Sequence, residues 1–236
     1  MIRLVTFDLD NTLWAVDAVI RRAESALNDW LDRRVPEYNQ LAADTRRAIA
    51  KSVTDADPRI VHDISRLRET VMRETVEHCG YNPARAARLA ADAFAEFMDW
   101  RHRVQFFPAA VDVLAELAES YTLAALTNGN ANFERLGLDR YFAFGYCAAE
   151  VGAKKPDPAM FERAMAHAGV EPAEAVHVGD HAVDDVQGAA AVGMATIWVN
   201  LACADESPPA TATVTRLEDV PSAVARLSEQ GLSTRS

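Results

Sequence analysis

Two aspartates end the first apolar run of the chain. The residues TFDLDNTLW occupy positions 6–14, so Asp8 and Asp10 stand two positions apart directly after the run IRLVTF. Side chains at alternate positions of an extended chain point to the same side, and two carboxylates held so close together repel each other. A cation or a proton must therefore neutralise them, which suits the pair to metal binding and to acid–base catalysis.

Later apolar runs also end in polar side chains. LTNGN supplies Thr127 and Asn128, GAKKPDP supplies Lys155, and HVGDHAVDD supplies Asp180. Carboxylates suit Mg²⁺, a hard ion that prefers oxygen ligands. The Thr127 hydroxyl and the Asn128 backbone N–H can donate to phosphoryl oxygens, and a lysine can cancel charge on a transferring phosphoryl group. One carboxylate could then attack phosphorus to give an acyl phosphate, while its neighbour protonates the leaving oxygen and later activates water.

The apolar runs are short, rich in β-forming residues, and alternate with helical segments. Near-continuously apolar runs are typical of parallel strands covered on both faces. Their alternation with helices predicts an α/β fold with a doubly wound parallel sheet, whose ligands bind at the carboxyl ends of the strands. The expected strands are 2–7, 121–126, 175–178 and 195–199, with weaker candidates at 143–146 and 212–215.

One long segment departs from this alternation. Residues 16–104 show no convincing strand, and their apolar residues recur at helical spacing, as in Ile20, Leu27 and Leu31. The pattern predicts a four-helix insert after the first strand. We therefore expect a catalytic core formed by residues 1–15 and 105–236, and a helical domain formed by residues 16–104.

Composition narrows the class of partner. The 236 residues carry a net charge of -11, which argues against nucleic acid or an anionic membrane as the main partner. The three cysteines are far apart and in no CxxC spacing, which is typical of a reduced, cytoplasmic protein. No signal peptide or membrane-spanning run is evident. The expected partner is a small molecule, and the chain is expected to be a monomer or a homodimer.

Four segments, taken in order, resemble the motifs of the haloacid dehalogenase-like (HAD) hydrolase superfamily. They are FDLDNTLW, LTNGN, KKPDPAMF and VGDHAVDDVQGA. The resemblance covers nearly the whole chain, because the helical insert stands where that family has its helical, C1-type cap. It implies a Rossmann-like core, an enzyme, Mg²⁺ as cofactor, and hydrolysis of a phosphate monoester through an aspartyl-phosphate intermediate.

The resemblance also implies a role for each motif residue. Asp8 would be the nucleophile and Asp10 the general acid and base. Thr127, the neighbouring Asn128 and Lys155 would bind and orient the phosphoryl group. The metal ligands would be Asp8, the backbone carbonyl of Asp10, and a third residue, Asp180.

The acidic residues that follow the third metal ligand are also assigned by the resemblance. Asp185 fits the family's second acidic position better than Asp184, because it lies five residues after Asp180. Both are expected to act behind the metal ligands. His181 stands where the family frequently has serine.

Substrate choice is expected to lie in the cap. The segments HDISRLR, WRHR and TNGNA are similar to bacterial flavin-pathway phosphatases, which act on FMN and on 5-amino-6-(5-phospho-D-ribitylamino)uracil. A small phosphorylated metabolite is therefore the expected substrate. The side chains that could contact it are Trp14, His62, Arg66, Arg68 and Arg101. For Trp14, packing under the cap is an equal alternative.

Three other functions stay open. A phosphatase for nucleotides or sugar phosphates would use the same motifs. A 2-haloacid dehalogenase shares the fold and the aspartate nucleophile, but it needs no acid two residues later, so Asp10 disfavours it. A receiver-type signalling module also combines clustered aspartates with Thr and Lys, but its chain is about half as long and has no helical insert.

Overall fold

A six-stranded, all-parallel sheet forms the centre of the computed structural model, which describes residues 1–205 and 208–233. The strand order is β3-β2-β1-β4-β5-β6. This confirms the predicted α/β doubly wound fold. The strands are β1 (Leu4–Phe7), β2 (Thr122–Thr127), β3 (Phe142–Cys147), β4 (Ala175–Gly179), β5 (Ala195–Val199) and β6 (Ala212–Val214).

The order of the strands decides which side chains meet at the edge of the sheet. The first strand, β1, pairs on one side with β2 and on the other with β4. Asp8 follows β1 directly, and Asp180 follows β4 directly. Because all strands run in the same direction, their carboxyl ends share one edge of the sheet, and the two aspartates emerge there as neighbours.

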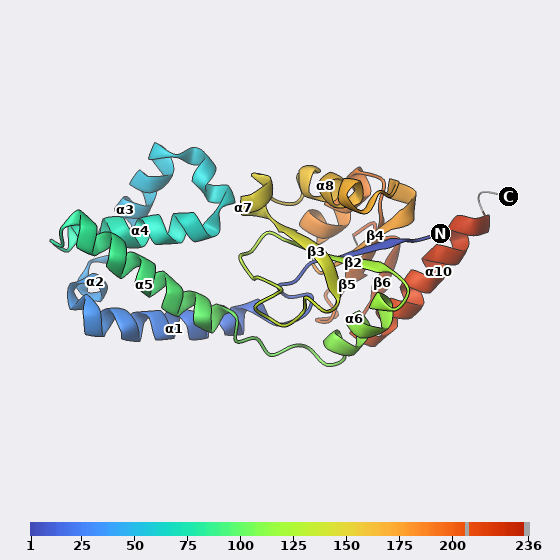
Figure 1. The fold of residues 1–236 in the computed structure, drawn as a ribbon, viewed down its shortest axis with the longest axis horizontal. Coiled ribbons are helices and arrows are strands. Elements are labelled where there is room, and N and C mark those ends of the chain that lie inside the picture. The colour runs from blue at the N-terminus through green and yellow to red at the C-terminus, as the bar shows by residue number, and fades with distance from the viewer. Residues whose placement is uncertain (206–207, 234–236) are drawn as a thin grey trace. The chain divides into compact units, whose positions relative to one another are not determined.

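Helices cover both faces of this sheet. In Figure 1, α8 lies on one face, and α6 and α10 lie on the other. The α8 helix ends at Gly169, whose φ of 62° is a left-handed conformation that glycine adopts without strain. The helices are α6 (Ala110–Ala118), α7 (Ala148–Val151), α8 (Ala159–Ala168), α9 (Gly188–Ala191) and α10 (Val220–Ser233), with 3₁₀ turns at Pro172–Glu174 and Leu217–Asp219 and a π-helical turn at Ala182–Gln187.

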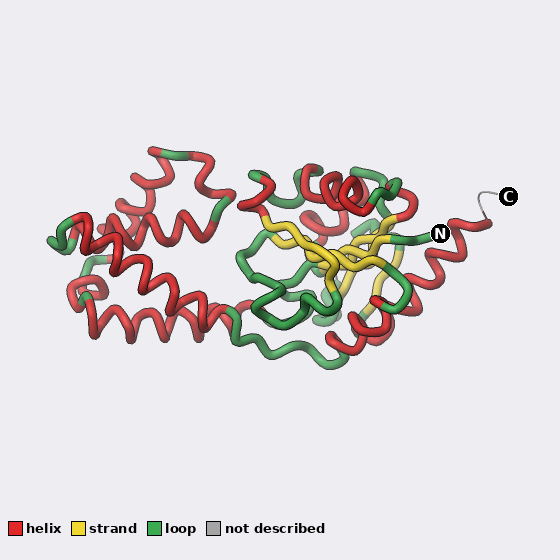
Figure 2. The backbone as a smooth tube through the Cα atoms, in the orientation of Figure 1, coloured by secondary structure: helices red, strands yellow, loops and turns green. Residues whose placement is uncertain are grey.

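The chain divides into two units, and the sheet belongs to one of them. Unit 1 comprises Met1–Ala15 and Gln105–Ser236, and unit 2 comprises Val16–Val104. The described residues of unit 2 contain no strand, as the tube in Figure 2 shows. The helices of unit 2 are α1 (Val16–Arg34), α2 (Pro36–Gln40), α3 (Ala43–Ala56), α4 (Ile64–His78) and α5 (Pro83–Arg101), with a 3₁₀ turn at Pro58–His62.

Apolar stripes hold unit 2 together. The α5 helix packs against both α1 and α4. Leu27 and Leu31 of α1, Val76 of α4, and Ala90 and Phe97 of α5 are buried in one cluster. The four long helices are those that a four-helix insert requires. The short α2 is an addition that the apolar spacing did not indicate, and Pro36 stands at its first position, where proline is favoured.

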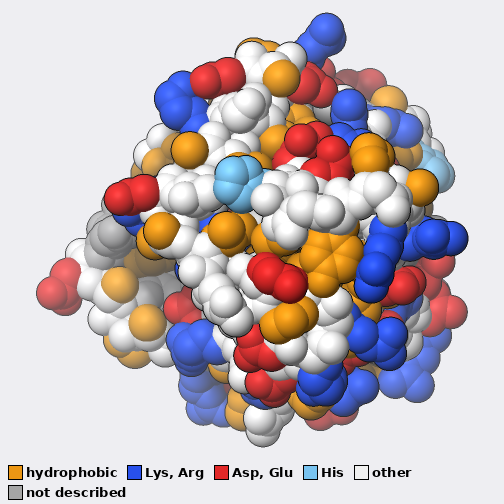
Figure 3. All heavy atoms as spheres, turned by 90° about the vertical axis from the view of Figure 1, so that its left-hand side faces the viewer, with side chains coloured by type: hydrophobic (Ala, Val, Ile, Leu, Met, Phe, Trp, Pro, Cys, Tyr) orange, Lys and Arg blue, Asp and Glu red, His pale blue; other side chains and the backbone are white. Residues whose placement is uncertain are grey.

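Charges of both signs lie on the face of the molecule that Figure 3 shows. Basic and acidic side chains are intermixed there, and hydrophobic side chains are scattered among them. In the part of the chain that the structure describes, no helix has the length and apolar character needed to cross a membrane.

Candidate active site

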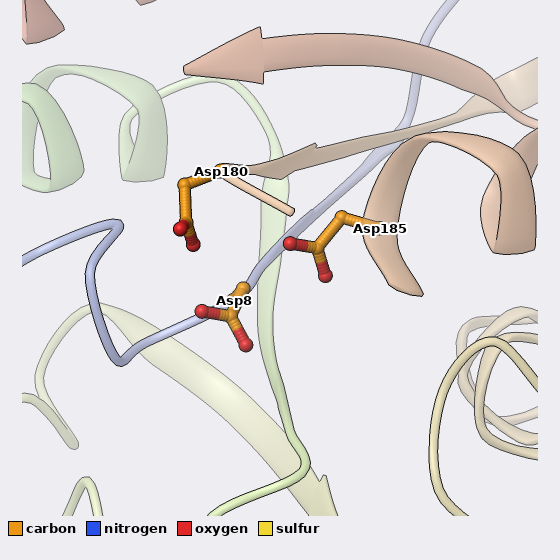
Figure 4. A group of neighbouring side chains, drawn as sticks. All are labelled: Asp8, Asp180 and Asp185. Carbon is orange, nitrogen blue, oxygen red and sulfur yellow. The ribbon is translucent and has the colours of Figure 1, made fainter. Parts of the chain in front are cut away.

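Three carboxylates converge at the carboxyl edge of the sheet. Asp8 comes from the end of β1, Asp180 from the end of β4, and Asp185 from the π-helical turn at Ala182–Gln187 (Figure 4). One oxygen atom from each lies within 4.8 Å of the other two. Asp8 and Asp185 are buried, so water screens their mutual repulsion poorly.

Lys155 supplies the positive charge that this cluster needs. Its Nζ lies 2.7 Å from Asp8 Oδ1, 2.7 Å from Asp185 Oδ1 and 2.7 Å from the carbonyl oxygen of Leu126, which gives each of its three protons an acceptor. Burial alone would lower the pKa of Lys155, but the charges of Asp185 and Asp8 outweigh burial and raise that pKa above its usual value. Lys155 is therefore a permanent cation beside Asp8.

A glycine makes room for Asp185. A Cβ atom at Gly179 would lie 2.3 Å from Asp185 Cγ, so only glycine fits at the end of β4. Asp185 Oδ2 accepts a hydrogen bond of 2.9 Å from the His181 backbone N–H. Burial would raise the pKa of Asp185, but the Lys155 ammonium and the bond from His177 outweigh burial and hold that pKa well below its usual value. Asp185 is thus a fixed anion.

The surroundings of the other two carboxylates, Asp8 and Asp180, disfavour their charged forms. Burial raises the pKa of Asp8 well above its usual value, and the charges of Asp185 and Asp180 add to that effect while Lys155 opposes it. Burial, together with the charge of Asp185, raises the pKa of Asp180 to about 6. The Thr12 hydroxyl lies 3.3 Å from Asp8 Oδ2 and 3.1 Å from Asp180 Oδ1. One lysine and one hydroxyl leave negative charge in excess, and an all-oxygen donor set of this kind fits Mg²⁺.

The raised pKa of Asp180 makes stability depend on pH. A carboxyl group with a raised folded-state pKa stabilises the fold fully only below its unfolded-state pKa of 3.8, and this contribution is lost as pH rises through about 6. Asp180→Asn, which cannot ionise, should escape this loss. Urea denaturation in EDTA gives the free energy of unfolding of Asp180→Asn minus that of wild type. This difference should be about 1–3 kcal/mol larger at about pH 7.5 than at about pH 4.5.

Asp112→Asn is the matched control for that measurement. Asp112 is an exposed aspartate in the first turn of α6, so the same change of charge there should give a difference from wild type that varies little with pH. An Asp180→Asn difference that is equal at the two pH values would contradict the electrostatic account of Asp180.

Beside the carboxylates, the loop after β2 forms a second polar wall. The Thr127 side chain is buried, and its Oγ1 accepts a hydrogen bond of 2.9 Å from the Gly129 backbone N–H. The Asn128 side chain binds the main chain of Lys155 twice. Its Oδ1 accepts from the Lys155 N–H at 2.7 Å, and its Nδ2 donates to the Lys155 carbonyl at 2.9 Å and to Asp184 Oδ2 at 3.1 Å. Asn128 and Asp184 therefore fix the loop from which Lys155 projects.

Asp10 is held by the tryptophan four residues further on. Trp14 Nε1 donates a hydrogen bond of 3.0 Å to Asp10 Oδ1, and the indole packs edge-on against Phe106, with ring centroids 5.8 Å apart. The Trp14 side chain is fully buried. Trp14 thus packs within unit 1 and orients Asp10, and its contact with an aromatic leaving group stays a prediction.

All of the predicted motif residues line one cavity. The cavity has a volume of about 160 Å³ and lies wholly within unit 1. Its lining also includes Asn11, Gly129 and His181. The motif residues brought together in it are Asp8, Asp10, Thr127, Asn128, Lys155, Asp180, Asp184 and Asp185.

The predicted selectivity residues of unit 2 are placed differently. Arg68 makes an ion pair of 2.6 Å with Glu24, and its guanidinium carbon lies 3.9 Å from the centroid of the Phe97 ring. Arg66 makes an ion pair of 3.3 Å with Asp57. His62 ends the 3₁₀ turn, and Arg101 is buried at the end of α5. Arg66 and Arg68 thus have partners within their own unit, and contact of these four residues with substrate stays a prediction.

Two buried polar residues behind the cavity were not among the predicted site residues. Thr6 of β1 and His177 of β4 are register partners in the sheet. His177 Nε2 lies 3.1 Å from Asp185 Oδ1, and Thr6 Oγ1 lies 2.8 Å from His177 Nδ1. A sequence signal did exist, because each is the one polar residue inside an otherwise apolar strand.

A family model agrees with this arrangement of motifs. Residues 2–193 match the model described as haloacid dehalogenase-like hydrolase. The chain belongs to the haloacid dehalogenase-like hydrolases. The predictions of this superfamily, and of an enzyme, are thereby confirmed, and the acidic cavity at the carboxyl edge of the sheet is the candidate active site of a HAD hydrolase.

Several relatives of this HAD hydrolase carry names that refer to a substrate. The Escherichia coli (strain K12) 5-amino-6-(5-phospho-D-ribitylamino)uracil phosphatase YigB is 33% identical over 198 residues, which are 84% of this chain and 83% of the relative. Phosphoserine phosphatase of Thermus thermophilus is 39% identical over 150 residues, which are 61% of this chain and 59% of the relative.

A solved structure gives a different name. The structure described as 2-haloacid dehalogenase from Pseudomonas syringae pv. Tomato DC3000 has 43% sequence identity and a TM-score of 0.90, and the match covers 96% of this chain and 99% of that one. The HAD fold is therefore shared along nearly the whole length, while the names of the relatives divide between phosphatase and dehalogenase.

Proposed function

We propose that this HAD hydrolase is a Mg²⁺-dependent phosphatase that cleaves a small phosphate monoester through an aspartyl-phosphate intermediate. The observation that carries the proposal is the second carboxylate, Asp10, which lines the same cavity as Asp8 and is oriented by Trp14. Ester cleavage needs a proton for the leaving oxygen, and Asp10 can supply it. The phosphatase names of the Escherichia coli and Thermus relatives support the same chemistry.

The proposed reaction has two steps, and residues of the cavity act in both. A carboxylate oxygen of Asp8 attacks phosphorus, so that a new P–O bond forms while the P–O bond to the leaving group breaks, and Asp10 gives that leaving oxygen a proton. In the second step Asp10 takes a proton from water, which attacks the phosphorus and releases phosphate from Asp8. Lys155, 2.7 Å from Asp8 Oδ1, orients the nucleophile and opposes the rise in its pKa that burial causes.

The same residues would hold the metal ion. Asp8, the backbone carbonyl of Asp10, and Asp180 are the proposed ligands, and Asp185 stands behind them with its oxygen atoms committed to Lys155 and His181. A bound Mg²⁺ would neutralise the phosphoryl oxygens and the carboxylates around them. Thr127 and the backbone after it would bind the remaining phosphoryl oxygens.

The substrate that we propose is a phosphorylated metabolite of the flavin pathway, either FMN or 5-amino-6-(5-phospho-D-ribitylamino)uracil. The Escherichia coli relative, 83% of which is matched, is named for 5-amino-6-(5-phospho-D-ribitylamino)uracil, and the segments HDISRLR and WRHR are similar to phosphatases of that pathway. In this proposal, residues 1–15 and 105–236 are the catalytic core, and residues 16–104 are a cap that selects the substrate and excludes water. The phosphoserine phosphatase relative makes another phosphorylated metabolite the alternative. A cytoplasmic location stays a prediction.

Phosphate release tests the proposal directly. We expect the protein to release phosphate from FMN and from p-nitrophenyl phosphate with Mg²⁺, and to lose this activity in EDTA. A kcat/KM for FMN at least about tenfold above that for the aryl ester would support the flavin-pathway substrate. Release from the aryl ester alone would keep the mechanism and direct the search to other metabolites. Release that continues in EDTA would contradict the role given to the metal.

Dehalogenation is the second candidate, because the Pseudomonas syringae structure described as a 2-haloacid dehalogenase is 43% identical. Halide leaves without a proton and needs no metal, so this reaction would use Asp8 but not Asp10. Halide release from 2-chloropropionate in EDTA, without phosphate release from any ester, would favour the dehalogenase and contradict the phosphatase.

A further inference from the structure

Behind the cavity lies a polar pair that does not reach it. Thr6 and His177 are 0% and 1% exposed, and they face each other across the β1–β4 ladder. Neither lines the cavity. An imidazole and a hydroxyl cost free energy when they are buried in an apolar sheet, unless hydrogen bonds repay it. Any effect of the pair on the reaction must pass through other side chains.

Hydrogen bonds link this pair to the nucleophile. Thr6 Oγ1 lies 2.8 Å from His177 Nδ1, and His177 Nε2 lies 3.1 Å from Asp185 Oδ1. The same Asp185 oxygen accepts from Lys155 Nζ at 2.7 Å, and Lys155 Nζ also donates to Asp8 Oδ1 at 2.7 Å. The path therefore runs from Thr6 through His177, Asp185 and Lys155 to Asp8.

The acceptors along this path determine which nitrogen of the His177 imidazole carries the proton. Burial lowers the pKa of His177, so the ring is neutral and carries one N–H. Asp185 is ionised and can only accept, so that proton belongs on Nε2. Nδ1 is then an acceptor. The Thr6 hydroxyl lies 2.8 Å from Nδ1 and 3.3 Å from the Val176 carbonyl oxygen, and its single proton goes to the nearer acceptor, Nδ1. The imidazole is further confined by Phe161, whose ring centroid lies 5.1 Å from that of His177 at an interplanar angle of 81°.

We propose that Thr6 and His177 are positioning residues: the Thr6 hydroxyl, together with the Asp185 carboxylate, fixes His177 as its Nε2–H tautomer, and this N–H holds Asp185 where it shares the Lys155 ammonium with Asp8. In the opposite tautomer, the Nε2 lone pair would face the Asp185 oxygen and repel it. Asp185 would turn away, and Lys155 would follow its charge and leave Asp8 less well oriented. The catalytic part of this inference rests on the proposed function, whereas the tautomer does not.

Nitrogen NMR of the metal-free protein, with all 236 residues present, tests the tautomer without any assay of activity. The chain has six histidines, and after ¹⁵N-histidine labelling the His177 signals are those that disappear in His177→Gln. We expect a protonated Nε2 and an unprotonated Nδ1. A protonated Nδ1, alone or together with a protonated Nε2, would overturn the proposal. In Thr6→Val, the exclusive Nε2–H pattern should be lost, and in Thr6→Ser it should remain.

Kinetics with p-nitrophenyl phosphate test the positioning role. Thr6→Val should lower kcat by roughly ten- to a hundredfold, as loss of supporting contacts does at other sites, with KM within about twofold. Thr6→Ser, which keeps the hydroxyl, should retain near wild-type kcat. Thr196→Val is the matched control, because Thr196 is a buried threonine of β5 that is hydrogen-bonded to Thr211. It should lose stability but not kcat.

The outcomes separate the two proposals. If wild type releases phosphate and Thr6→Val keeps its kcat, or loses no more than Thr196→Val, the positioning role is wrong and the phosphatase stands. If wild type releases no phosphate from any ester, the proposed function fails, and the NMR spectra of wild type and Thr6→Val still decide whether Thr6 fixes the tautomer.

Discussion

Asp8→Asn is expected to lower phosphate release by at least about 10⁴-fold while the protein stays folded. The amide is a poor nucleophile, and no other carboxylate occupies the position of Asp8 at the end of β1. The fold should tolerate the change, because burial already disfavours the charged form of Asp8 and raises its pKa. Lys155 keeps Asp185 and the Leu126 carbonyl as acceptors. Phosphate release and a thermal melt, compared with wild type, measure the two effects.

The covalent step offers a sharper readout for the same variant. Wild type, quenched in acid after mixing with ³²P-labelled substrate, should carry labelled phosphate on the protein, and Asp8→Asn should carry none. Asp112→Asn, with the same chemical change on the exposed face of α6, should retain both label and turnover. Labelling of Asp8→Asn at the wild-type level would assign the nucleophile to another residue.

The predicted site residues are those that strand ends and motif order identify. Each follows a strand or begins a helix, and a parallel sheet gathers such positions at one edge. Asp8 and Asp180 are 172 positions apart in the sequence, yet β1 and β4 are neighbouring strands, so that the structure places both residues in one cavity. The family's motif order, rather than composition, distinguished Asp185 from Asp184.

Contacts that depend on the register between strands could not be predicted from the sequence. Thr6 and His177 each read as a single polar residue in an apolar strand, and their pairing is a consequence of how β1 and β4 align. The roles of Trp14 and Arg68 were similarly undetermined. The indole N–H of Trp14 can donate to Asp10 only because the backbone turns sharply after β1. Arg68 can donate to Glu24, 44 residues away, only because α1 and α4 belong to one helical bundle. Spacing along the chain specifies neither geometry.

Asp10→Asn is expected to lower kcat by about 10²–10⁴-fold, with the loss depending on the leaving group. An alkoxide leaves poorly without a proton, whereas p-nitrophenolate leaves readily. The loss should therefore be largest for an alkyl phosphate and smallest for p-nitrophenyl phosphate. The variant should keep its local structure, because an asparagine oxygen can still accept the hydrogen bond from Trp14 Nε1. Steady-state kinetics with both esters measure the difference.

A measurement of Mg²⁺ binding shows whether Asp10→Asn has lost only its proton donor or also the metal site. If only the backbone carbonyl of Asp10 contacts the metal, the rise in melting temperature on adding Mg²⁺ should be the same in Asp10→Asn as in wild type, and it should be much reduced in Asp180→Asn. Equal losses of kcat for the two esters would contradict the proton transfer. Loss of the Mg²⁺ effect in Asp10→Asn would instead make its carboxylate a ligand. A dehalogenase, whose halide leaves unprotonated, would lose little activity in this variant, so Asp10→Asn also separates the two reactions that this fold supports.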